Sequence, residues 1–274
     1  MYRAIKRNDL QTVIKYHNKG LWTPNAIDVA AAHGHLEIVK WLHEHSVEGY
    51  TTNAMDLAAS NGYLEIVKWL HEHRIIGCIY RAIDSAAQNG HLEIVKFLHK
   101  NEIEGCTTDA MNLAAKNGHL DVVKWLHEHR TEGCTTVAMN YAAYKGHLHV
   151  VKWLHKNRTE GCTTYAMDLA TSNGHLHIVK WLHENRTEGC TAEAMNIATR
   201  KGHLEILQYL YSNYKHLVTK VNQQTYQKIL PFIQEDFRKI FEKIQKENIV
   251  REFITKKLVY HPTSCYMKRI VNNF

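Results

Sequence analysis

The sequence predicts an all-α fold, a solenoid of stacked helix-turn-helix repeats with a C-terminal helical segment. The first observation is a tripeptide, glycine followed by histidine or tyrosine and then leucine, which returns every 28 residues. Its copies begin at Gly34, Gly62, Gly90, Gly118, Gly146, Gly174 and Gly202. A fixed period of about 20 to 50 residues is typical of solenoids, whose units bury their apolar faces only against their neighbours. The second observation is that each period contains start and stop signals for two short helices.

The unit that contains Gly118 shows these signals clearly. Thr107 is a suitable N-cap for a first helix over about 108–116, and Gly118 can adopt the left-handed conformation that ends it. The second helix is expected to begin at Leu120 or the residue before it and to end near Arg130. Its apolar residues are spaced by three and four, which predicts one buried stripe. The remaining linker has room only for a turn.

The same signals place seven complete first helices and eight second helices along the chain. The second helices are expected to begin near Leu10, Leu36, Leu64, Leu92, Leu120, Leu148, Leu176 and Leu204. In the first full unit, Pro24 follows Thr23 at the start of the first helix, where proline is favoured. The chain begins inside an incomplete first helix. There Asn8 replaces the stop glycine, because asparagine also tolerates the left-handed conformation.

Residues 113–124 resemble the core motif of the ankyrin repeat family, and the resemblance returns along residues 1–212. Their sequence is Leu-Ala-Ala-Lys-Asn-Gly-His-Leu-Asp-Val-Val-Lys. The family's usual unit has about 33 residues. The residues missing here fall between the second helix and the next first helix, where ankyrin repeats project a β-hairpin finger. The chain is therefore similar to a short-loop variant of the family without the finger. The resemblance implies a protein-binding scaffold whose first-helix side is the concave binding surface.

Residues that break the repeat are expected to carry recognition. Two positions of the first helix vary, the residue after the cap and the residue seven further on, and both lie on one helical face. In the later units they are Arg81, Gln88, Asp109, Lys116, Val137, Tyr144, Tyr165, Ser172, Glu193 and Arg200. Tyrosine and arginine are favoured anchors of protein interfaces. We expect a partner protein to bind along this strip; the alternative is that these are solvated positions free to vary.

Equivalent residues of stacked units form ladders, and the cysteine ladder is the first of them. It consists of Cys78, Cys106, Cys134, Cys162 and Cys190. Stacked helices lie about 8 to 10 Å apart, whereas a disulfide needs Cα atoms within about 7 Å, so free thiols packed at the turn are expected. A metal-binding or redox row is the alternative, and the lack of any Cys-x-x-Cys pair disfavours it.

A second ladder places aspartate or asparagine in every complete first helix. Its members are Asp28, Asp56, Asp84, Asn112, Asn140, Asp168 and Asn196. Side chains of this kind accept hydrogen bonds from nearby backbone amides, so the ladder is expected to tie neighbouring turns together. A row of cation sites is the alternative, and the three asparagines disfavour it.

Histidine and aromatic ladders follow the second helices. Histidine precedes the helix at His35, His91, His119, His147, His175 and His203, and recurs near its end at His43, His71, His99, His127, His155 and His183. Pairs such as His147 and His149 point to different faces, whereas a helical zinc site needs histidines four apart, so packing is expected rather than a metal. The aromatic ladder is Trp41, Trp69, Phe97, Trp125, Trp153, Trp181 and Tyr209. Core packing is favoured over base stacking on single-stranded nucleic acid, because ankyrin units carry leucine at this position.

The sequence gives no basis for catalysis or for a membrane span. It contains no glycine-rich phosphate loop and no nucleophile with a positioned base, so we expect neither an enzyme nor a cofactor. No apolar run is long enough to cross a bilayer, and the first residues lack the apolar region of a secretory signal. The expected location is the cytosol or the nucleus, and the expected state is a monomer.

The C-terminal segment, residues 213–274, carries the chain's whole surplus of positive charge. It holds 12 lysines and arginines and 5 aspartates and glutamates, a surplus equal to the net charge of +7 of the full chain. The array over residues 1–212 is therefore neutral and offers no electrostatic case for binding nucleic acid. An amphipathic stripe in the tail predicts helix, and its simplest role is to cap the last repeat. The stripe consists of Ile229, Leu230, Ile233, Phe237, Ile240, Phe241 and Ile244.

Other roles are open for the tail. Leu230 and Pro231, followed by residues 236–241, are distantly similar to the start of an F-box, although the spacing is two residues longer. That similarity implies a ubiquitin-ligase adaptor whose array selects the substrate. The basic tail could instead bind nucleic acid or acidic membrane surfaces. For the whole chain, the remaining alternative is a structural spacer without a specific partner.

Overall fold

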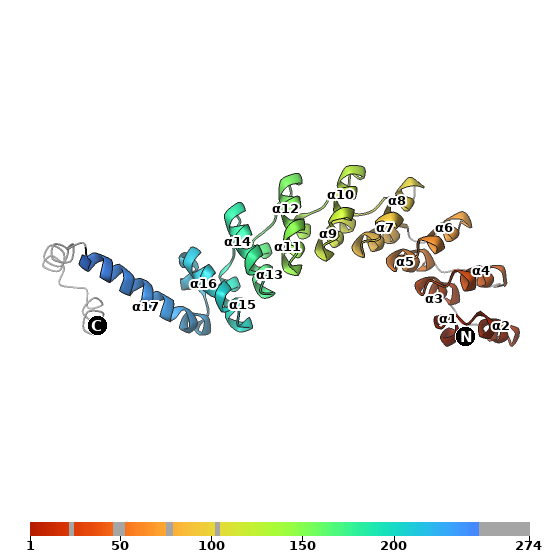
Figure 1. The fold of residues 1–274 in the computed structure, drawn as a ribbon, viewed down its shortest axis with the longest axis horizontal. Coiled ribbons are helices and arrows are strands. Elements are labelled where there is room, and N and C mark those ends of the chain that lie inside the picture. The colour runs from red at the N-terminus through yellow and green to blue at the C-terminus, as the bar shows by residue number, and fades with distance from the viewer. Residues whose placement is uncertain (22–24, 46–52, 75–78, 102–104, 247–274) are drawn as a thin grey trace.

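The computed structural model describes residues 1–21, 25–45, 53–74, 79–101 and 105–246, except for the side chains of residues 79, 80 and 240–246. Within these ranges every regular element is a helix (Figure 1). The first helices are α1 (Tyr2–Lys6), α3 (Ala26–Ala32), α5 (Asn53–Ser60), α7 (Ile79–Gln88), α9 (Thr108–Asn117), α11 (Thr136–Lys145), α13 (Tyr165–Ser172) and α15 (Ala192–Lys201). The second helices are α2 (Leu10–Asn18), α4 (Leu36–His45), α6 (Leu64–Glu72), α8 (Leu92–Lys100), α10 (Leu120–His129), α12 (Leu148–Asn157), α14 (Leu176–Asn185) and α16 (Leu204–Asn213). A 3-10 helix, η1 (Lys215–Lys220), and a long helix, α17 (Gln223–Lys246), follow in the described part of the tail.

The predicted solenoid of helix pairs is confirmed. All eight second helices begin at the predicted leucines, and α9 begins and ends within one residue of its predicted bounds. Thr107 caps α9, since its side chain accepts the backbone N–H of Asp109, and Gly118 has a φ of 84° after the last turn. Asn8 has a φ of 56°, as expected for a residue in the glycine position. The predictions for Thr23, Pro24, Cys78 and the chain beyond Lys246 lie outside the described residues.

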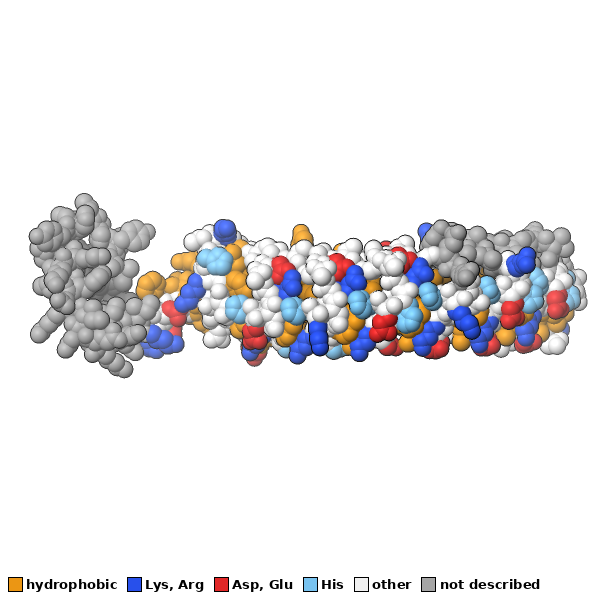
Figure 2. Space-filling model, turned by 90° about the horizontal axis from the view of Figure 1, so that it is seen from above, with side chains coloured by type: hydrophobic (Ala, Val, Ile, Leu, Met, Phe, Trp, Pro, Cys, Tyr) orange, Lys and Arg blue, Asp and Glu red, His pale blue; other side chains and the backbone are white. Residues whose placement is uncertain are grey.

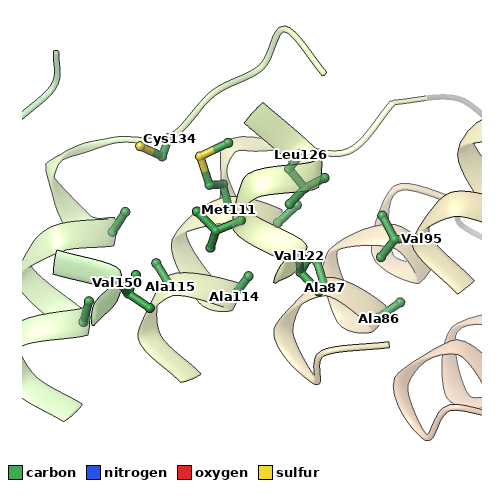
Figure 3. Close-up of a cluster of buried hydrophobic side chains, with 14 of the residues drawn as sticks. Ala86, Ala87, Val95, Met111, Ala114, Ala115, Val122, Leu126, Cys134 and Val150 are labelled. Carbon is green, nitrogen blue, oxygen red and sulfur yellow. The ribbon is translucent and has the colours of Figure 1, made fainter. Parts of the chain in front are cut away.

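Alanine pairs bring neighbouring first helices close together. Ala114 and Ala115 of α9 are fully buried, as are Ala142 and Ala143 of α11. Small side chains allow a short distance between helix axes, and α9 packs extensively against both α7 and α11. Figure 3 shows Ala114 and Ala115 among the buried valine, leucine and methionine side chains that complete the core. The first helices therefore form the continuous, tightly packed side of the stack.

The second helices stand further apart because bulky rings lie between them. Trp125 is half-buried against the core, and the ring of His99 from the preceding unit meets it edge-on with centroids 5.2 Å apart. Helix α10 consequently contacts α8 much less than α9 contacts α7. Unequal spacing on the two sides bends the stack. The array forms an arc with the first helices on its inner side (Figure 1).

The described tail packs against the last unit through η1 and the first part of α17. Leu217 and Ile229 are buried, and Tyr211 of α16 donates a hydrogen bond to Asp236 Oδ2 at 2.9 Å. Helix α17 continues through Pro231 without interruption. Only part of its predicted apolar stripe is covered by the array: Ile233 packs against the core, whereas Phe237 is 60% exposed. Among the described residues, no helix combines the length and the apolar character that crossing a bilayer requires.

Candidate functional site

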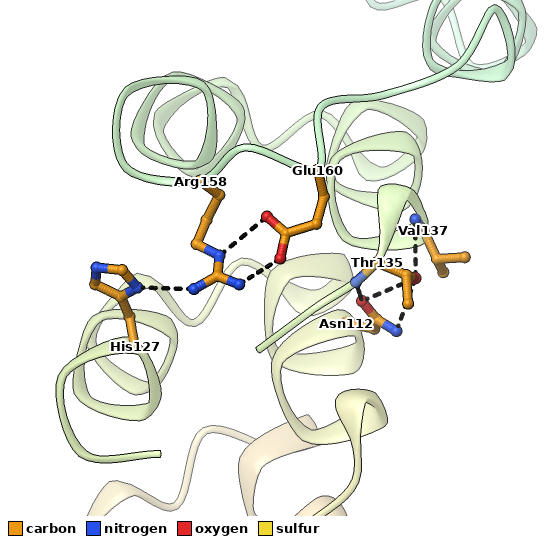
Figure 4. Close-up of polar contacts among 6 residues, drawn as sticks. All are labelled: Asn112, His127, Thr135, Val137, Arg158 and Glu160. Atoms are coloured by element: carbon orange, nitrogen blue, oxygen red, sulfur yellow. Dashed lines mark hydrogen bonds and ion pairs between the residues drawn. The ribbon is translucent and has the colours of Figure 1, made fainter. Parts of the chain in front are cut away.

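Hydrogen bonds from one unit to the next fix where the first helices begin. Asn112 Oδ1 of α9 accepts the backbone N–H of Thr135 at 3.0 Å. Thr135 caps α11 in turn, because its Oγ1 accepts the backbone N–H of Val137 at 3.3 Å (Figure 4). Val137 is the first strip residue of its helix. Its backbone is thus held by a chain of bonds that begins in the preceding unit.

The same chain of bonds recurs along the array. It joins Asp84, Thr107 and Asp109; Asn140, Thr163 and Tyr165; and Asp168, Thr191 and Glu193. The prediction that the aspartate and asparagine ladder ties neighbouring turns together is confirmed for these units. At the end of the array, Asn196 Oδ1 accepts the backbone N–H of Asn222 at 3.0 Å. The tail therefore supplies the donor that the next unit supplies elsewhere.

Asp56 is the member of this ladder without a threonine. Ile79 occupies the position of Thr107, Thr135, Thr163 and Thr191, so the next unit has no hydroxyl at this position. Asp56 Oδ1 is buried and accepts no hydrogen bond from the described residues. Burial raises the pKa of Asp56 to about 6, and the nearby Arg81 offsets only part of this effect. The folded state therefore carries an unfavourable buried charge at neutral pH.

Asp56→Asn is expected to raise the free energy of unfolding at pH 7.5 by about 1 kcal/mol, because it removes this charge. The full value of about 1.36 kcal/mol per pKa unit does not apply, since solvent screens the half-buried carboxylate. The folded pKa exceeds the unfolded value of 3.8, so the native protein gains stability as the pH falls through about 6 towards 3.8. Urea unfolding of both proteins at several pH values measures the difference between their free energies of unfolding. This difference should become smaller as the pH falls from about 6 towards 3.8. The exposed Asp109→Asn is the control, and an equal gain there would contradict the account.

The strip residues line the inner side of the arc on five successive first helices. The first strip position is exposed in all five helices, namely at Arg81, Asp109, Val137, Tyr165 and Glu193. Of the residues seven further on, Arg200 is exposed, whereas Gln88, Lys116, Tyr144 and Ser172 are half-buried. Arg200 Nη1 lies 3.6 Å from Glu193 Oε1 of the same helix, so the two positions do share a face.

An apolar and aromatic patch interrupts the polar strip at α11 and α13. Val137 is 37% exposed and Tyr165 is 65% exposed. Between Val137 and Tyr144 lies Tyr141, which is 38% exposed. Helix α11 buries alanines and a methionine on one face and still presents these apolar groups to solvent on the other. We call Val137, Tyr141, Tyr144 and Tyr165 the aromatic patch.

Tyr141 was not among the predicted strip residues. Comparison of the units with one another could have identified it. Its equivalents are Val29, Leu57, Ser85, Leu113, Leu169 and Ile197, so it is the aromatic member of an otherwise aliphatic or small set. Lysines flank the patch as well. Lys116 Nζ lies 5.1 Å from the ring centre of Tyr141, and Lys145 Nζ lies 5.5 Å from that of Tyr144. Contacts of this kind hold a cation over the ring face.

The turn after α13 anchors the C-terminal end of the patch. Asn173 Nδ2 donates to the backbone oxygen of Tyr144 at 2.7 Å, and His175 Nε2 contacts the same oxygen at 3.1 Å. Asn117 Nδ2 donates to the backbone oxygen of Gln88 at 2.7 Å in the same way. His35 and His91, like His175, contact a backbone oxygen of the preceding unit. The repeat alone does not reveal these contacts, because they join residues about 30 positions apart.

The outer side of the array is held by a different network. Arg158 donates from Nε to Glu160 Oε2 at 3.1 Å and from Nη2 to Glu160 Oε1, while its Nη1 lies 3.1 Å from Nδ1 of His127 (Figure 4). The bond from Arg158 lowers the pKa of Glu160. Arg130 and Arg186 repeat the arrangement with His99 and His155. Figure 2 shows acidic, basic and histidine side chains following one another along one face of the array.

The predicted packing roles of the aromatic and later histidine ladders are confirmed by these contacts. His127 meets Trp153 edge-on at 5.3 Å between centroids, and His155 meets Trp181 at 5.2 Å. Arginine can only donate, so Nδ1 of the histidine is the acceptor in each of these contacts. The short linkers after α10, α12 and α14 therefore attach each of these helices to the second helix before it.

The described cysteines are free thiols, as predicted. Cys106, Cys134 and Cys162 are buried and Cys190 is half-buried. Burial raises the pKa of the first three to about 11 and that of Cys190 to about 12, so all four are protonated at neutral pH. No group of three or more potential metal ligands occurs in the part of the chain that the structure describes.

Comparison with known families agrees with this geometry. A family model described as ankyrin repeats in three copies matches residues 83–162 and 139–222. A second model, described as ankyrin repeats in many copies, matches residues 27–71 and 55–99. A search of the curated proteins finds no match. The two family models together extend over residues 27–222, and the chain belongs to the ankyrin repeat family.

Proposed function

We propose that the chain is a protein-interaction scaffold that binds its partner along the first-helix strip, with the aromatic patch as the centre of the interface. Ankyrin repeats generally mediate protein–protein interaction and are typically non-catalytic. The observation that carries the proposal is the exposure of Val137, Tyr141 and Tyr165 on two adjacent helices of the inner side. Tyrosine is enriched among the residues that dominate binding energy.

The surroundings of the patch have the composition of an interface rim. Polar and charged strip residues lie on both sides of it, namely Arg81, Gln88, Asp109, Lys116, Ser172, Glu193 and Arg200. Interfaces commonly combine an apolar centre with a polar, solvent-accessible edge. The α11 backbone that presents Val137 is also fixed by the Asn112 and Thr135 bonds, so little ordering is needed on binding.

A variant that removes the patch without disturbing the fold tests the proposal. The variant combines four substitutions: Val137→Asn, Tyr141→Ser, Tyr144→Ser and Tyr165→Asn. Each introduces the residue that another unit of the chain carries at the same position of its repeat. These residues are, in the same order, Asn53, Ser85, Ser60 and Asn25. Tagged full chains are used to isolate partners from cells that express the protein, and the affinity for each partner is then measured. We expect the patch variant to bind the partner at least tenfold more weakly, a loss of about 1.4 kcal/mol or more.

The matched control changes exposed aromatic residues elsewhere. Tyr226 and Phe237 of α17 are 42% and 60% exposed, and Tyr226→Ser with Phe237→Ser should leave the affinity unchanged. Equal binding by the patch variant and the native chain would contradict the proposal. If neither the native chain nor the control retained a specific partner, the structural-spacer alternative would replace it.

Adaptor function through the tail is the second candidate, and the exposure of Phe237 favours it. Part of the F-box-like region is already engaged within the chain, because Asp236 accepts bonds from Tyr211 and Lys215. Loss of a ubiquitin-ligase subunit from the Tyr226 and Phe237 variant, with the array partner retained, would support the adaptor role. Binding of the basic tail to nucleic acid or acidic membranes is tested by a salt titration of the full chain with those ligands, because electrostatic binding should weaken between about 50 and 200 mM salt.

A further inference from the structure

Helices α4, α6, α8, α10, α12 and α14 each present one row of polar side chains on the outer side of the array. The residues follow at spacings of three and four, so they lie on one helical face. The rows are Glu37, Lys40 and Glu44 in α4; Glu65, Lys68 and Glu72 in α6; Glu93, Lys96 and Lys100 in α8; Asp121, Lys124 and Glu128 in α10; His149, Lys152 and Lys156 in α12; and His177, Lys180 and Glu184 in α14. All are exposed except Lys40, Lys68 and Lys96, which are half-buried. We call these the outer rows. The α12 row is basic throughout, whereas the α4, α6 and α10 rows place a carboxylate on both sides of the lysine.

In the rows near the N-terminus the lysine is paired with a glutamate of the same helix, whereas the lysines of α12 have no such partner. Lys40, Lys68 and Lys96 lie 2.9, 2.7 and 2.7 Å from the glutamate three residues earlier. In α12 and α14 that glutamate is replaced by His149 and His177, and the first turns contain no acidic residue. Lys152 and Lys156 form no ion pair with any residue that the structure describes. The neutral array therefore has a local excess of positive charge on these two helices.

Acidic side chains are scarcer here than on the preceding second helices. The α14 row contributes Glu184 and the α10 row contributes Asp121 and Glu128, whereas the α12 row contributes none. Glu160, in the linker after α12, is bound to Arg158. The outer rows of α12 and α14 together hold three lysines and one glutamate.

We propose that the outer rows of α12 and α14 form a second interaction surface that binds an acidic segment of a partner protein. This surface lies on the opposite side of the array from the aromatic patch. Lys152, Lys156 and Lys180 would contact carboxylates directly, with His149 and His177 beside them. The surface spans two units, which suits a short segment with a few acidic residues.

An acidic protein segment fits this surface better than nucleic acid does. Nucleic-acid binding commonly uses about 6 to 10 phosphate contacts, and single strands also require exposed rings for stacking. The surface has three lysines, and the rings of the second helices around them are already packed. Trp153 and Trp181 are half-buried and packed edge-on against His127 and His155, and Tyr209 lies edge-on to His183 with Lys180 Nζ 5.8 Å from its ring centre.

The test converts the α12 row into a row that already occurs in the chain. His149→Glu with Lys156→Glu gives α12 the Glu, Lys, Glu row of α6, so the variant contains only a pattern that this fold accepts. The probe is a fluorescein-labelled hexaglutamate peptide, titrated with the full-length chain at low salt, about 50 mM, where screening is weak. We expect the affinity of the variant to be at least tenfold lower. The reverse exchange in α6, Glu65→His with Glu72→Lys, should raise the affinity.

The tail supplies the control for net charge. Lys220→Glu with Lys228→Glu changes exposed basic residues of the tail and should alter the affinity for the peptide less than twofold. An equal loss in this control, or no loss in the α12 variant, would overturn the proposal. Tighter binding of a single-stranded oligonucleotide or of phosphatidylserine vesicles than of the peptide, lost in the α12 variant, would also overturn it, because the ligand would then belong to another class.

Discussion

Leu154→Ala is expected to lower the free energy of unfolding by about 2 to 5 kcal/mol, the range for removing a large buried aliphatic side chain. Leu154 lies in α12 at the centre of a core cluster and is 1% exposed. The expected loss combines the transfer of the missing atoms with the cavity left behind. Urea unfolding followed by circular dichroism measures it.

The linear architecture adds a second expectation for this variant. Units of a solenoid contact only their neighbours, so a weakened unit reduces the coupling between the two halves of the array. We expect the single unfolding transition to broaden or to separate into two. Leu204→Ala is the matched control, because Leu204 is 59% exposed, and its replacement should change stability by no more than about 0.5 kcal/mol. Equal losses in the two variants would contradict the packing described for α12.

Asn140→Ala is expected to cost about 1 to 3 kcal/mol, the penalty for leaving a buried donor without its acceptor. Asn140 is 7% exposed. Its Oδ1 accepts the backbone N–H of Thr163 at 3.1 Å, and its Nδ2 donates to Thr163 Oγ1 at 3.0 Å. Removing the amide group breaks both bonds between the units of α11 and α13.

Asn140→Asp separates hydrogen bonding from side-chain volume. Aspartate performs the same function at Asp84 and Asp168, where it accepts both the N–H and the hydroxyl of the following threonine. Asn140→Asp should therefore cost clearly less than Asn140→Ala at pH 7.5. If alanine were tolerated as well as aspartate, the ladder would not contribute to coupling between units.

The repeat made most of the fold predictable from sequence, because local signals were repeated in successive units. Helix starts depend on caps such as Thr107, and helix ends depend on stops such as Gly118, and both act within a few residues. The role of Asn112 was also predictable, since a buried amide at a helix start has few partners other than the neighbouring turn. These features require no knowledge of long-range contacts.

Contacts between units were less predictable. The bond between His127 and Arg158 joins residues 31 apart, and nothing local to either residue indicates it. Tyr141 was missed because its position is aliphatic or small in the other units, and its 38% exposure depends on how α11 sits between its neighbours. The tail contains no repeat with which its residues can be compared. Which residues of its apolar stripe are buried and which, like Phe237, are exposed therefore became clear only from the structure.

The short linker has a consequence for recognition. Arg158 and Glu160 fill the place between successive units and bind His127 of the preceding second helix. A linker used in this way holds the stack together and presents no extended finger to a partner. Recognition on the inner side would then come from the helices themselves, and α11 and α13 expose Val137, Tyr141 and Tyr165 on adjacent helices.

Site-specific photo-crosslinking tests the proposed inner-side interface most directly. A benzophenone-bearing residue is placed at Tyr144 or Tyr165 in the full chain, and at the exposed outer residue Glu72 for comparison. Irradiation of the complex with the isolated partner is expected to crosslink that partner from Tyr144 and Tyr165 and not from Glu72. Crosslinks from Glu72, or from a benzophenone at Phe237, together with none from the two tyrosine positions, would contradict the account.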